Sequence, residues 1–478
     1  IEASAFDAAA AFAVLDDHRR SNWTPYVFKT TDYGRTWTSL ATPSLRGWAL
    51  VVEQDPVDRE LLFLGTEFGL YVSIDGGREW LPWRHGVPTV SVMDLVIHPT
   101  EHDLVIGTHG RSALVLDDIR PLRELDAATL AKPLHLFAAA DTRQYWRDAE
   151  AGGFGLGDGE YRGEGKPYGT ILTYSLNLPD LPLPDAEKEK ARQSAARAEK
   201  ARGSIWEPAP VEAKTADGEE EKTDEPLQVS IRIADAAGQT VRVFKGPAVL
   251  GLNRAVWDLR RDGFREPAQR GGRRRSGEPA PGPELPPGSY TATVTFRDQS
   301  AATTFQVLPD PRSTNTPADW ARRWAAVERI GCLQETAAAA VDQLADVRAD
   351  VEAVMERVHA AEIRRLKAER AEPEEEKLAE LPLVKNGRAL KARLDELERR
   401  FQQPPGTVGI VGGVRVMDRI GKAMGAVTSS WTPPSPTHAA HIQEAERLLA
   451  PALEALNALV AGEVAAFRQA VAAAGVGL

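Results

Sequence analysis

The first 130 residues carry their apolar side chains in short runs separated by glycine, aspartate and proline. Such runs lie at residues 26–28, 61–64, 70–72, 104–106 and 114–116. Short apolar runs between turn-forming residues are typical of β-strands. The pattern therefore predicts a first β-rich domain over residues 1–130, followed by a glycine-rich linker over residues 131–167.

A second β-rich region is predicted from residue 168 to residue 310. Apolar and polar residues alternate at 229–233, 290–294 and 304–307, which is the spacing of strands that bury one face. Two insertions interrupt this pattern, at 185–224 and at 263–287. The second contains the cluster Arg270 to Arg275. Their charged and proline-rich compositions predict solvated loops rather than packed structure.

From residue 316 to residue 478, apolar residues recur at helical spacing. The pattern predicts an α-helical domain with one long helix or a broken pair over 319–372 and further helices over 386–401 and 438–473, packed antiparallel. Cys332, the only cysteine, is expected to be a small buried residue on the first helix. The last helix carries an apolar stripe of Leu448, Leu449, Leu453, Leu456, Leu459 and Val460. This stripe is expected to pack within the domain, and a dimerisation or partner-binding face is the alternative.

Two copies of one octapeptide pattern, Ser/Thr-x-Asp-x-Gly-x-x-Trp, lie in the first region. Residues 30–37 match it with Thr in the seventh position, and residues 73–80 match it with Glu there. In such a turn the Asp carboxylate accepts backbone N–H groups, the glycine adopts positive φ, and the Trp packs between strands. We therefore expect structural roles for Thr30, Asp32, Gly34, Trp37, Ser73, Asp75, Gly77 and Trp80.

A third, degenerate unit follows, because Gly65-Thr66-Glu67 aligns with Gly107-Thr108-His109 and places Asp117 where Asp75 stood. A period of about 40 to 45 residues is that of one four-stranded propeller blade. With residues 94–99, 103–111 and 116–118, the region resembles the Asp-box (BNR-repeat) β-propellers, and most closely their bacterial sortilin-like, glycosyl-hydrolase-like group. This resemblance implies that residues 1–130 are the last three or so blades of a propeller.

The second β-rich region also resembles a known module. Residues 229–233, 235–238, 241–244, 251–253, 256–258 and 285–290 are similar to an immunoglobulin-like sandwich of the flagellar hook-capping type. The fold class expected for the whole chain is thus multidomain β plus α: about three propeller blades, an immunoglobulin-like β-sandwich and an antiparallel helical bundle. The resemblance further implies a periplasmic or extracellular location.

Three blades cannot close a ring, and the chain begins at Ile1 without an initiator methionine. We therefore expect a fragment or processed form of a longer protein. Its partner would be either the remaining N-terminal blades or a separate protein.

Composition narrows the function classes. The net charge is −11, which disfavours a nucleic-acid partner because such binders neutralise phosphates. No membrane span is expected, since no apolar run reaches the length needed to cross a bilayer. A single cysteine and scattered histidines indicate no metal site and no cofactor.

Few residues suggest site chemistry. Asp94 and Glu67 are the weak catalytic candidates, because glycosidases need two carboxylates and both residues lie near predicted inner strands. His109 and Arg111 are weak candidates for binding an anionic ligand or a glycan at a strand end, with an interblade hydrogen-bond contact as the alternative. His98 and His102 are expected to be exposed turn residues.

Two functions remain open from the sequence. The first is a non-catalytic binding or scaffold protein of the bacterial cell envelope that recognises a ligand or a protein through its propeller. The second is a glycoside hydrolase, sialidase-like or xyloglucanase-like, whose catalytic carboxylates lie in blades absent from this chain. The sequence favours the first, because the acids of this chain form no recognisable catalytic set.

Overall fold

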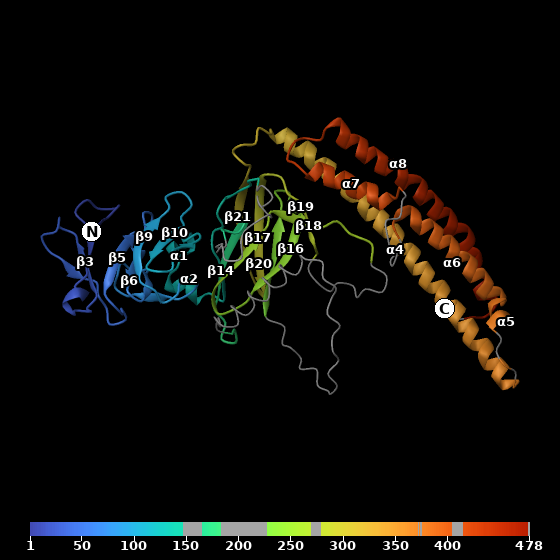
Figure 1. Cartoon of the computed structure of the whole chain (residues 1–478), viewed down its shortest axis with the longest axis horizontal. Coiled ribbons are helices and arrows are strands. Elements are labelled where there is room, and N and C mark those ends of the chain that lie inside the picture. Colours follow the sequence, from blue (N-terminus) through green and yellow to red (C-terminus); the bar gives the residue numbers. More distant parts are fainter. Residues whose placement is uncertain are drawn as a thin grey trace.

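A computed structural model describes residues 1–146, 165–182, 227–268, 279–370, 372, 375–403 and 414–476. The predicted insertion at 185–224, the Arg270 to Arg275 cluster and residues 147–164 of the predicted linker lie outside these residues. The chain is mixed β and α: sheets that are antiparallel except for the β13–β21 pair fill its N-terminal and central parts, and helices form its C-terminal part (Figure 1).

The N-terminal part consists of three consecutive antiparallel sheets in which each strand pairs with its neighbour in sequence. The first contains β1 (Glu2–Ala3), β2 (Ala11–Leu15), β3 (Tyr26–Thr30) and β4 (Thr38–Ser39), with η1 (His18–Arg20) after β2. The second contains β5 (Ala49–Gln54), β6 (Leu62–Thr66), β7 (Gly69–Ser73) and β8 (Leu81–Trp83). The third contains β9 (Val92–Ile97), β10 (Leu104–Thr108) and β11 (Ala113–Leu116), after which the chain enters α1 (Arg120–Arg123) and α2 (Ala127–Ala131).

The three sheets pack face to face through two apolar clusters. Phe12 and Val27 of the first sheet meet Leu62, Leu64 and Tyr71 of the second sheet. The opposite face of the second sheet meets the third sheet through Leu61, Phe63, Leu70, Val72, Val92, Leu95, Leu104 and Ile106. The second sheet is therefore buried on both faces, whereas the first and third sheets are each covered on one face only.

The central part is a β-sandwich. One sheet contains β12 (Leu134–Leu136), β14 (Thr170–Leu176) and β17 (Gly251–Trp257). The other contains β13 (Thr142–Arg143), β21 (Gln299–Leu308), β20 (Gly288–Phe296), β15 (Gln228–Ala234) and β16 (Thr240–Pro247), and a small sheet pairs β18 (Arg260–Asp262) with β19 (Pro281–Glu284). Both larger sheets contribute to one core that includes Leu172, Tyr174, Ile231, Trp257 and Val294.

Two sequence predictions are wrong in this central part. The predicted linker contains β12 and β13, which pair with β14 and β21. Their side chains complete the sandwich, and strands this short leave little periodicity to detect. The predicted loop at 263–287 contains the strand β19, which pairs with β18. It also contains Phe264, whose ring packs against Gly331 of α4. Distant partners therefore order residues whose local composition resembles a loop.

The C-terminal part is an elongated antiparallel bundle. It contains α4 (Pro317–Ala368), α5 (Glu375–Ala379), α6 (Pro382–Phe401), α7 (Val416–Thr428) and α8 (Pro436–Leu459), which continues through a π-helical turn (Val460–Val464) into α9 (Ala465–Ala473). Thr316 caps α4 through a capping box with Asp319. Periodicity predicted α4, α6 and the last helix with small shifts at their ends. It did not predict α7, and Cys332 is exposed rather than buried.

The apolar stripe of the last helix faces its own bundle. Leu449, Leu456 and Leu459 are buried in the core, and Leu448, Leu453 and Val460 pack against it. Among the described residues, helix 436–473 is the one stretch long and apolar enough to cross a membrane by length and composition. Because its apolar side chains fill the bundle core, length and composition alone give weak evidence for a membrane span.

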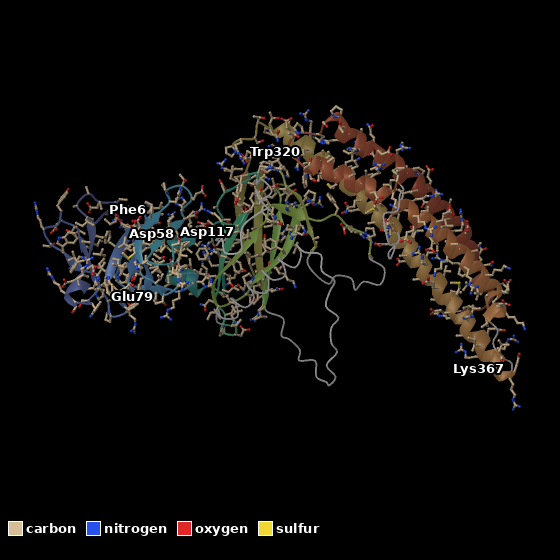
Figure 2. The ribbon with its side chains drawn as sticks, in the orientation of Figure 1. Phe6, Asp58, Glu79, Asp117, Trp320 and Lys367 are labelled. Carbon is tan, nitrogen blue, oxygen red and sulfur yellow. The ribbon has the colours of Figure 1, made fainter. Side chains whose placement is uncertain are left out.

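Polar and aromatic contacts join the three parts. At the first junction, where Asp117 lies (Figure 2), the Arg254 guanidinium donates to the backbone oxygens of Asp117 and Asp118 at 2.6 and 2.7 Å. At the second junction, Trp320 of α4 packs against Trp431, whose Nε1 donates to the Glu284 carboxylate at 3.2 Å. Figure 2 shows Trp320 where the helices meet the sandwich and Lys367 at the far tip of α4.

Candidate functional site

The three N-terminal sheets have two ends of different character. We call the end that carries residues 16–25, 40–48, 67–68, 84–91 and 109–112 the loop end, and the opposite end, with the octapeptide turns, the turn end. Strand pairing defines this division, because Leu15 faces Tyr26, Ala49 faces Thr66, and Val92 faces Thr108. Side chains that are far apart in sequence therefore meet at the loop end.

An aromatic group lies at the loop end between the first and second sheets. The His18 ring stacks on Trp48 at 4.5 Å between centroids, and Trp23 lies 5.3 Å from Trp48. The Asp16 carboxylate contacts His18 Nδ1 at 2.6 Å and fixes the orientation of that ring. Trp23 keeps 57% of its surface exposed. The group therefore presents an open indole beside charged side chains.

A chain of hydrogen bonds extends this end from the second sheet to the third. The Glu67 N–H donates to the Trp48 oxygen at 3.1 Å, and Ser91 Oγ donates to the Glu67 oxygen at 3.1 Å. The His109 N–H then donates to the Ser91 oxygen at 2.9 Å. Burial raises the pKa of the Glu67 carboxyl, while the charge of His18 opposes that rise. Two predicted residues, Glu67 and His109, thus belong to one connected surface.

The remaining binding candidate also lies at the loop end. Arg111 is in the turn between β10 and β11, close in sequence to His109, and both residues are exposed. Sequence reasoning missed His18, Trp23 and Trp48, because no spacing motif connects residues 18, 23 and 48. The available signal was the presence of two tryptophans in segments that the strand pattern assigns to loops.

The two catalytic candidates lie on different sheets, with Glu67 after β6 at the loop end and Asp94 in β9. Asp94 lies within β9 and is exposed, and its charge acts on Glu53 of β5. Burial, with the nearby charges of Glu2, Asp94 and Asp55, raises the pKa of Glu53 to about 7. Strands β1, β5 and β9 are each the edge strand of their sheet. The acid that Asp94 influences is therefore Glu53, which sequence reasoning did not select.

The octapeptide turns at the other end have matching local hydrogen bonds. The Thr36 N–H donates to Asp32 at 2.9 Å, and the Arg78 and Glu79 N–H groups donate to Asp75 at 3.0 and 3.1 Å. Hydrogen bonds from Thr36 lower the pKa of the Asp32 carboxyl. Gly34 and Gly77 have φ values of +80° and +90°, a region that favours glycine. The carboxylates of Asp32 and Asp75 are thus occupied by backbone N–H donors.

The third unit departs from this pattern by one residue. Leu70 pairs with Gly65, whereas Ala113 pairs with Gly107, so the β10–β11 turn is one residue longer than the β6–β7 turn. This insertion places Asp118, not Asp117, at the position equivalent to Asp75. The Asp118 carboxylate accepts from Arg120 Nε at 2.6 Å at the start of α1. The chain therefore continues into a helix where the other sheets form an outer strand.

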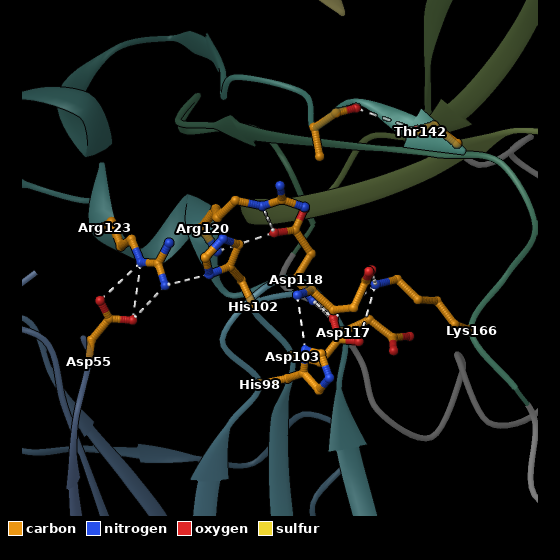
Figure 3. A network of polar contacts seen from close by, with 12 residues as sticks. Asp55, His98, His102, Asp103, Asp117, Asp118, Arg120, Arg123, Thr142 and Lys166 are labelled. Atoms are coloured by element: carbon orange, nitrogen blue, oxygen red, sulfur yellow. Dashed lines mark hydrogen bonds and ion pairs between the residues drawn. The ribbon is translucent and has the colours of Figure 1, made fainter. Parts of the chain in front are cut away.

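A buried ion-pair network closes the turn end of the second and third sheets (Figure 3). Arg123 donates through Nη2 to Asp55 at 2.8 Å, and Asp55 is fully buried. Arg123 Nη2 also lies 3.2 Å from His102 Nδ1. Burial and the charges of Arg123 and Arg120 lower the pKa of His102. The expectation that His102 is an exposed turn residue is wrong, because it is half-buried within this network.

Metal-binding chemistry has no visible centre in the part of the chain that the structure describes. No group of three or more His, Cys, Asp or Glu residues there could hold a metal ion. The loop end offers exposed aromatic rings together with carboxylates, imidazoles and guanidinium groups. Such a surface can stack on a ligand and hydrogen-bond to it, which is the chemistry of recognition.

No protein-family model and no curated protein matches the chain. Among solved structures, a GH74 enzyme from Niastella koreensis aligns with 23% of this chain and 20% of its own length at 22% identity, with a TM-score of 0.21. YCF48 bound to D1 peptide aligns with 20% of this chain and 32% of its own length at 18% identity, with a TM-score of 0.17.

The extracellular domain of a one-component system from B. thetaiotaomicron aligns with 63% of this chain and 31% of its own length at 11% identity, with a TM-score of 0.17. The chain thus spans a third or less of each of these structures. At these scores the likenesses favour neither a binding protein nor a hydrolase.

Proposed function

We propose that this chain is a non-catalytic binding and scaffold protein of the bacterial cell envelope. In this proposal the three N-terminal sheets are the last blades of an Asp-box β-propeller of the sortilin-like group. The central sandwich is an immunoglobulin-like spacer, and the helical bundle is a docking domain. Repeat spacing, the two octapeptide turns and the strand order of the sheets support the propeller assignment.

The observation that carries the binding function is the surface at the loop end. Exposed Trp23 stands beside the His18–Trp48 stack, and the Glu67 backbone connects that group to the loop of His109. Sugar rings present C–H faces that stack on indoles and hydroxyls that bond carboxylates and imidazoles. A glycan is therefore the ligand class that this combination favours.

Replacing Trp23 tests the proposal, with Trp37 as the matched control. Trp37 is also a partly exposed tryptophan of the first sheet, but it follows β3 at the turn end, whereas Trp23 precedes β3 at the loop end. On a glycan array we expect Trp23→Ala to weaken binding of a retained glycan by about tenfold, the loss of one aromatic contact. We expect Trp37→Ala to bind as the unsubstituted protein does. Equal binding by all three forms, or no glycan binding at all, would contradict the proposal.

One observation favours the alternative, a glycoside hydrolase. Burial raises the pKa of Glu53 to about 7, so this carboxyl can donate a proton near neutral pH, and Asp94 is one of the nearby charges that contribute to the rise. In this alternative the main catalytic carboxylates lie in further blades. Release of reducing ends from any glycan that the array retains would favour the hydrolase, and binding without release favours the scaffold.

A further inference from the structure

The loop end and the turn end of the three N-terminal sheets carry opposite charge. The turn-end segments 4–10, 31–37, 55–61, 74–80 and 98–103 contain nine acidic residues and three arginines. The loop-end segments contain five arginines and three acidic residues, namely Arg19, Arg20, Arg46, Arg84 and Arg111 with Asp16, Asp17 and Glu67. A positive end on a chain whose net charge is −11 is not a consequence of overall composition.

Three of the loop-end arginines are not neutralised by a neighbouring acid. Arg46, Arg84 and Arg111 are exposed, and none of them forms an ion pair with a residue that the structure describes. At the turn end, by contrast, the Arg78 guanidinium lies 3.8 Å from the Glu60 carboxylate. The positive charge of the loop end is therefore available to a ligand.

Local hydrogen bonds hold the backbone of the loops that carry these arginines. The Arg46 N–H donates to Tyr71 Oη at 3.2 Å. In the next loop, Trp83 Nε1 donates at 2.9 Å to the backbone oxygen of His85, which directly follows Arg84. A fixed backbone limits the conformational freedom that binding a ligand would otherwise remove.

The turn that carries Arg111 is fixed in the same way. Thr108 Oγ1 donates to the Ser112 oxygen at 2.6 Å and closes this turn. The His109 N–H of the turn donates to the Ser91 oxygen at 2.9 Å, which joins it to the preceding loop. With the other hydrogen bonds of the loop end, this contact places the three arginine-bearing loops side by side.

We infer that the loop end binds acidic glycans, which carry carboxylate or sulfate groups, in preference to neutral glycans. The inference rests on the proposed glycan recognition and adds the charge of the ligand. Guanidinium groups donate paired hydrogen bonds to the oxygens of such acid groups, while the Trp23 indole stacks on a sugar ring. The number of blades does not affect the inference, because blades stand side by side around an axis and leave their loop ends open.

The test is binding of the full chain to polygalacturonate, which carries carboxylates, to dextran sulfate and to neutral dextran, with a single-stranded oligonucleotide as a further polyanion. The variant is Arg84→Gln. Arg78→Gln is the matched control, because the two exposed arginines stand at opposite ends of β8 and each replacement removes one positive charge. Circular dichroism checks that both variants fold. Binding is measured at ionic strengths of about 0.01 M and about 0.15 M, where the screening length is about 30 Å and about 8 Å.

We expect an acidic polysaccharide to bind more tightly than dextran and to weaken as ionic strength rises. Arg84→Gln should weaken that binding by about fivefold, the contribution of one exposed ion pair, and Arg78→Gln should leave it unchanged. Whichever acidic polysaccharide binds more tightly supports the inference and identifies the acid group.

Equal binding of dextran, equal loss in the two variants, or tighter binding of the oligonucleotide would overturn the inference. A neutral glycan that is retained through Trp23 and is insensitive to Arg84→Gln would overturn it and leave the proposed function intact. Absence of binding to every glycan would contradict both.

Discussion

The two octapeptide turns share one sequence pattern but differ in what their tryptophans contact. Trp37 bonds through Nε1 to Gly34 within its own turn and is 40% exposed. Trp80 bonds through Nε1 to the Leu40 oxygen of the preceding sheet and is 1% exposed. The motif thus determines the conformation of the turn. Whether a neighbouring sheet covers the tryptophan determines how much that side chain stabilises the fold.

The largest expected effect is the loss of stability on replacing Trp80, and replacing Trp37 in parallel tests the difference between the two turns. Trp80→Ala should lower the free energy of unfolding of the sheet region by about 3 to 5 kcal/mol, because it leaves a cavity between two sheets. Trp37→Ala should cost about 1 kcal/mol or less, since it loses one local hydrogen bond at an exposed site. Hydrogen exchange of the β6 and β7 amides measures both. Equal losses would mean that the two turns have the same environment.

A second contrast concerns the turn after the first strand of each sheet. Asp55 accepts from the Val57 and Asp58 N–H groups at 2.8 and 2.7 Å. His98 occupies the equivalent position and caps its turn in the same way, accepting from the Glu101 N–H at 3.1 Å. Asp55 also pairs with Arg123, whose side chain is only 12% exposed, whereas His98 forms no ion pair with any residue that the structure describes. Of the two equivalent turns, the one after β5 in the second sheet therefore takes part in an ion pair, and the one after β9 in the third sheet caps its own backbone.

We expect Asp55→Ala to destabilise the sheet region by about 3 kcal/mol, because it leaves the Arg123 guanidinium buried without its carboxylate. His98→Ala should cost about 1 kcal/mol, the loss of a turn cap. Urea unfolding followed by amide exchange in β5 and β9 separates the two effects. A larger loss for His98→Ala than for Asp55→Ala would show that the ion pair is not the stabilising element.

The smallest expected effect is a pH dependence at Glu53. Its pKa is about 7 in the folded chain and 4.5 in the reference state, so the folded form binds the proton more tightly between these values. Stability therefore falls as pH rises from about 4.5 to about 7 and is level above that range. Because Glu53 is only half-buried, screening reduces the effect to about 1 kcal/mol.

Glu53→Gln removes the titrating group and should flatten this slope, gaining about 1 kcal/mol at pH 8 relative to the unsubstituted chain. Unfolding curves at pH 5, 6, 7 and 8 measure it. Glu79→Gln is the matched control, since Glu79 is an exposed glutamate of the same sheet. The same flattening in both variants would show that overall charge, rather than the site of Glu53, causes the slope.

The sequence by itself determined the local features of this protein. Short-range hydrogen bonding and glycine at positive φ define the turns at Asp32 and Asp75, and 3.6-residue periodicity defines α4 and the last helix. These features depend on residues only a few positions apart, so the local sequence pattern is enough to predict them.

The tertiary structure decided which of these residues meet. β12 and β13 are ordered by distant strands, and His18 joins Trp48 only because two sheets pack side by side. The burial of Phe63 and the exposure of Val105 likewise depend on a neighbouring sheet. Burial, charge coupling and site assembly are properties of contacts between segments far apart in sequence, and periodicity along the chain carries no information about those contacts.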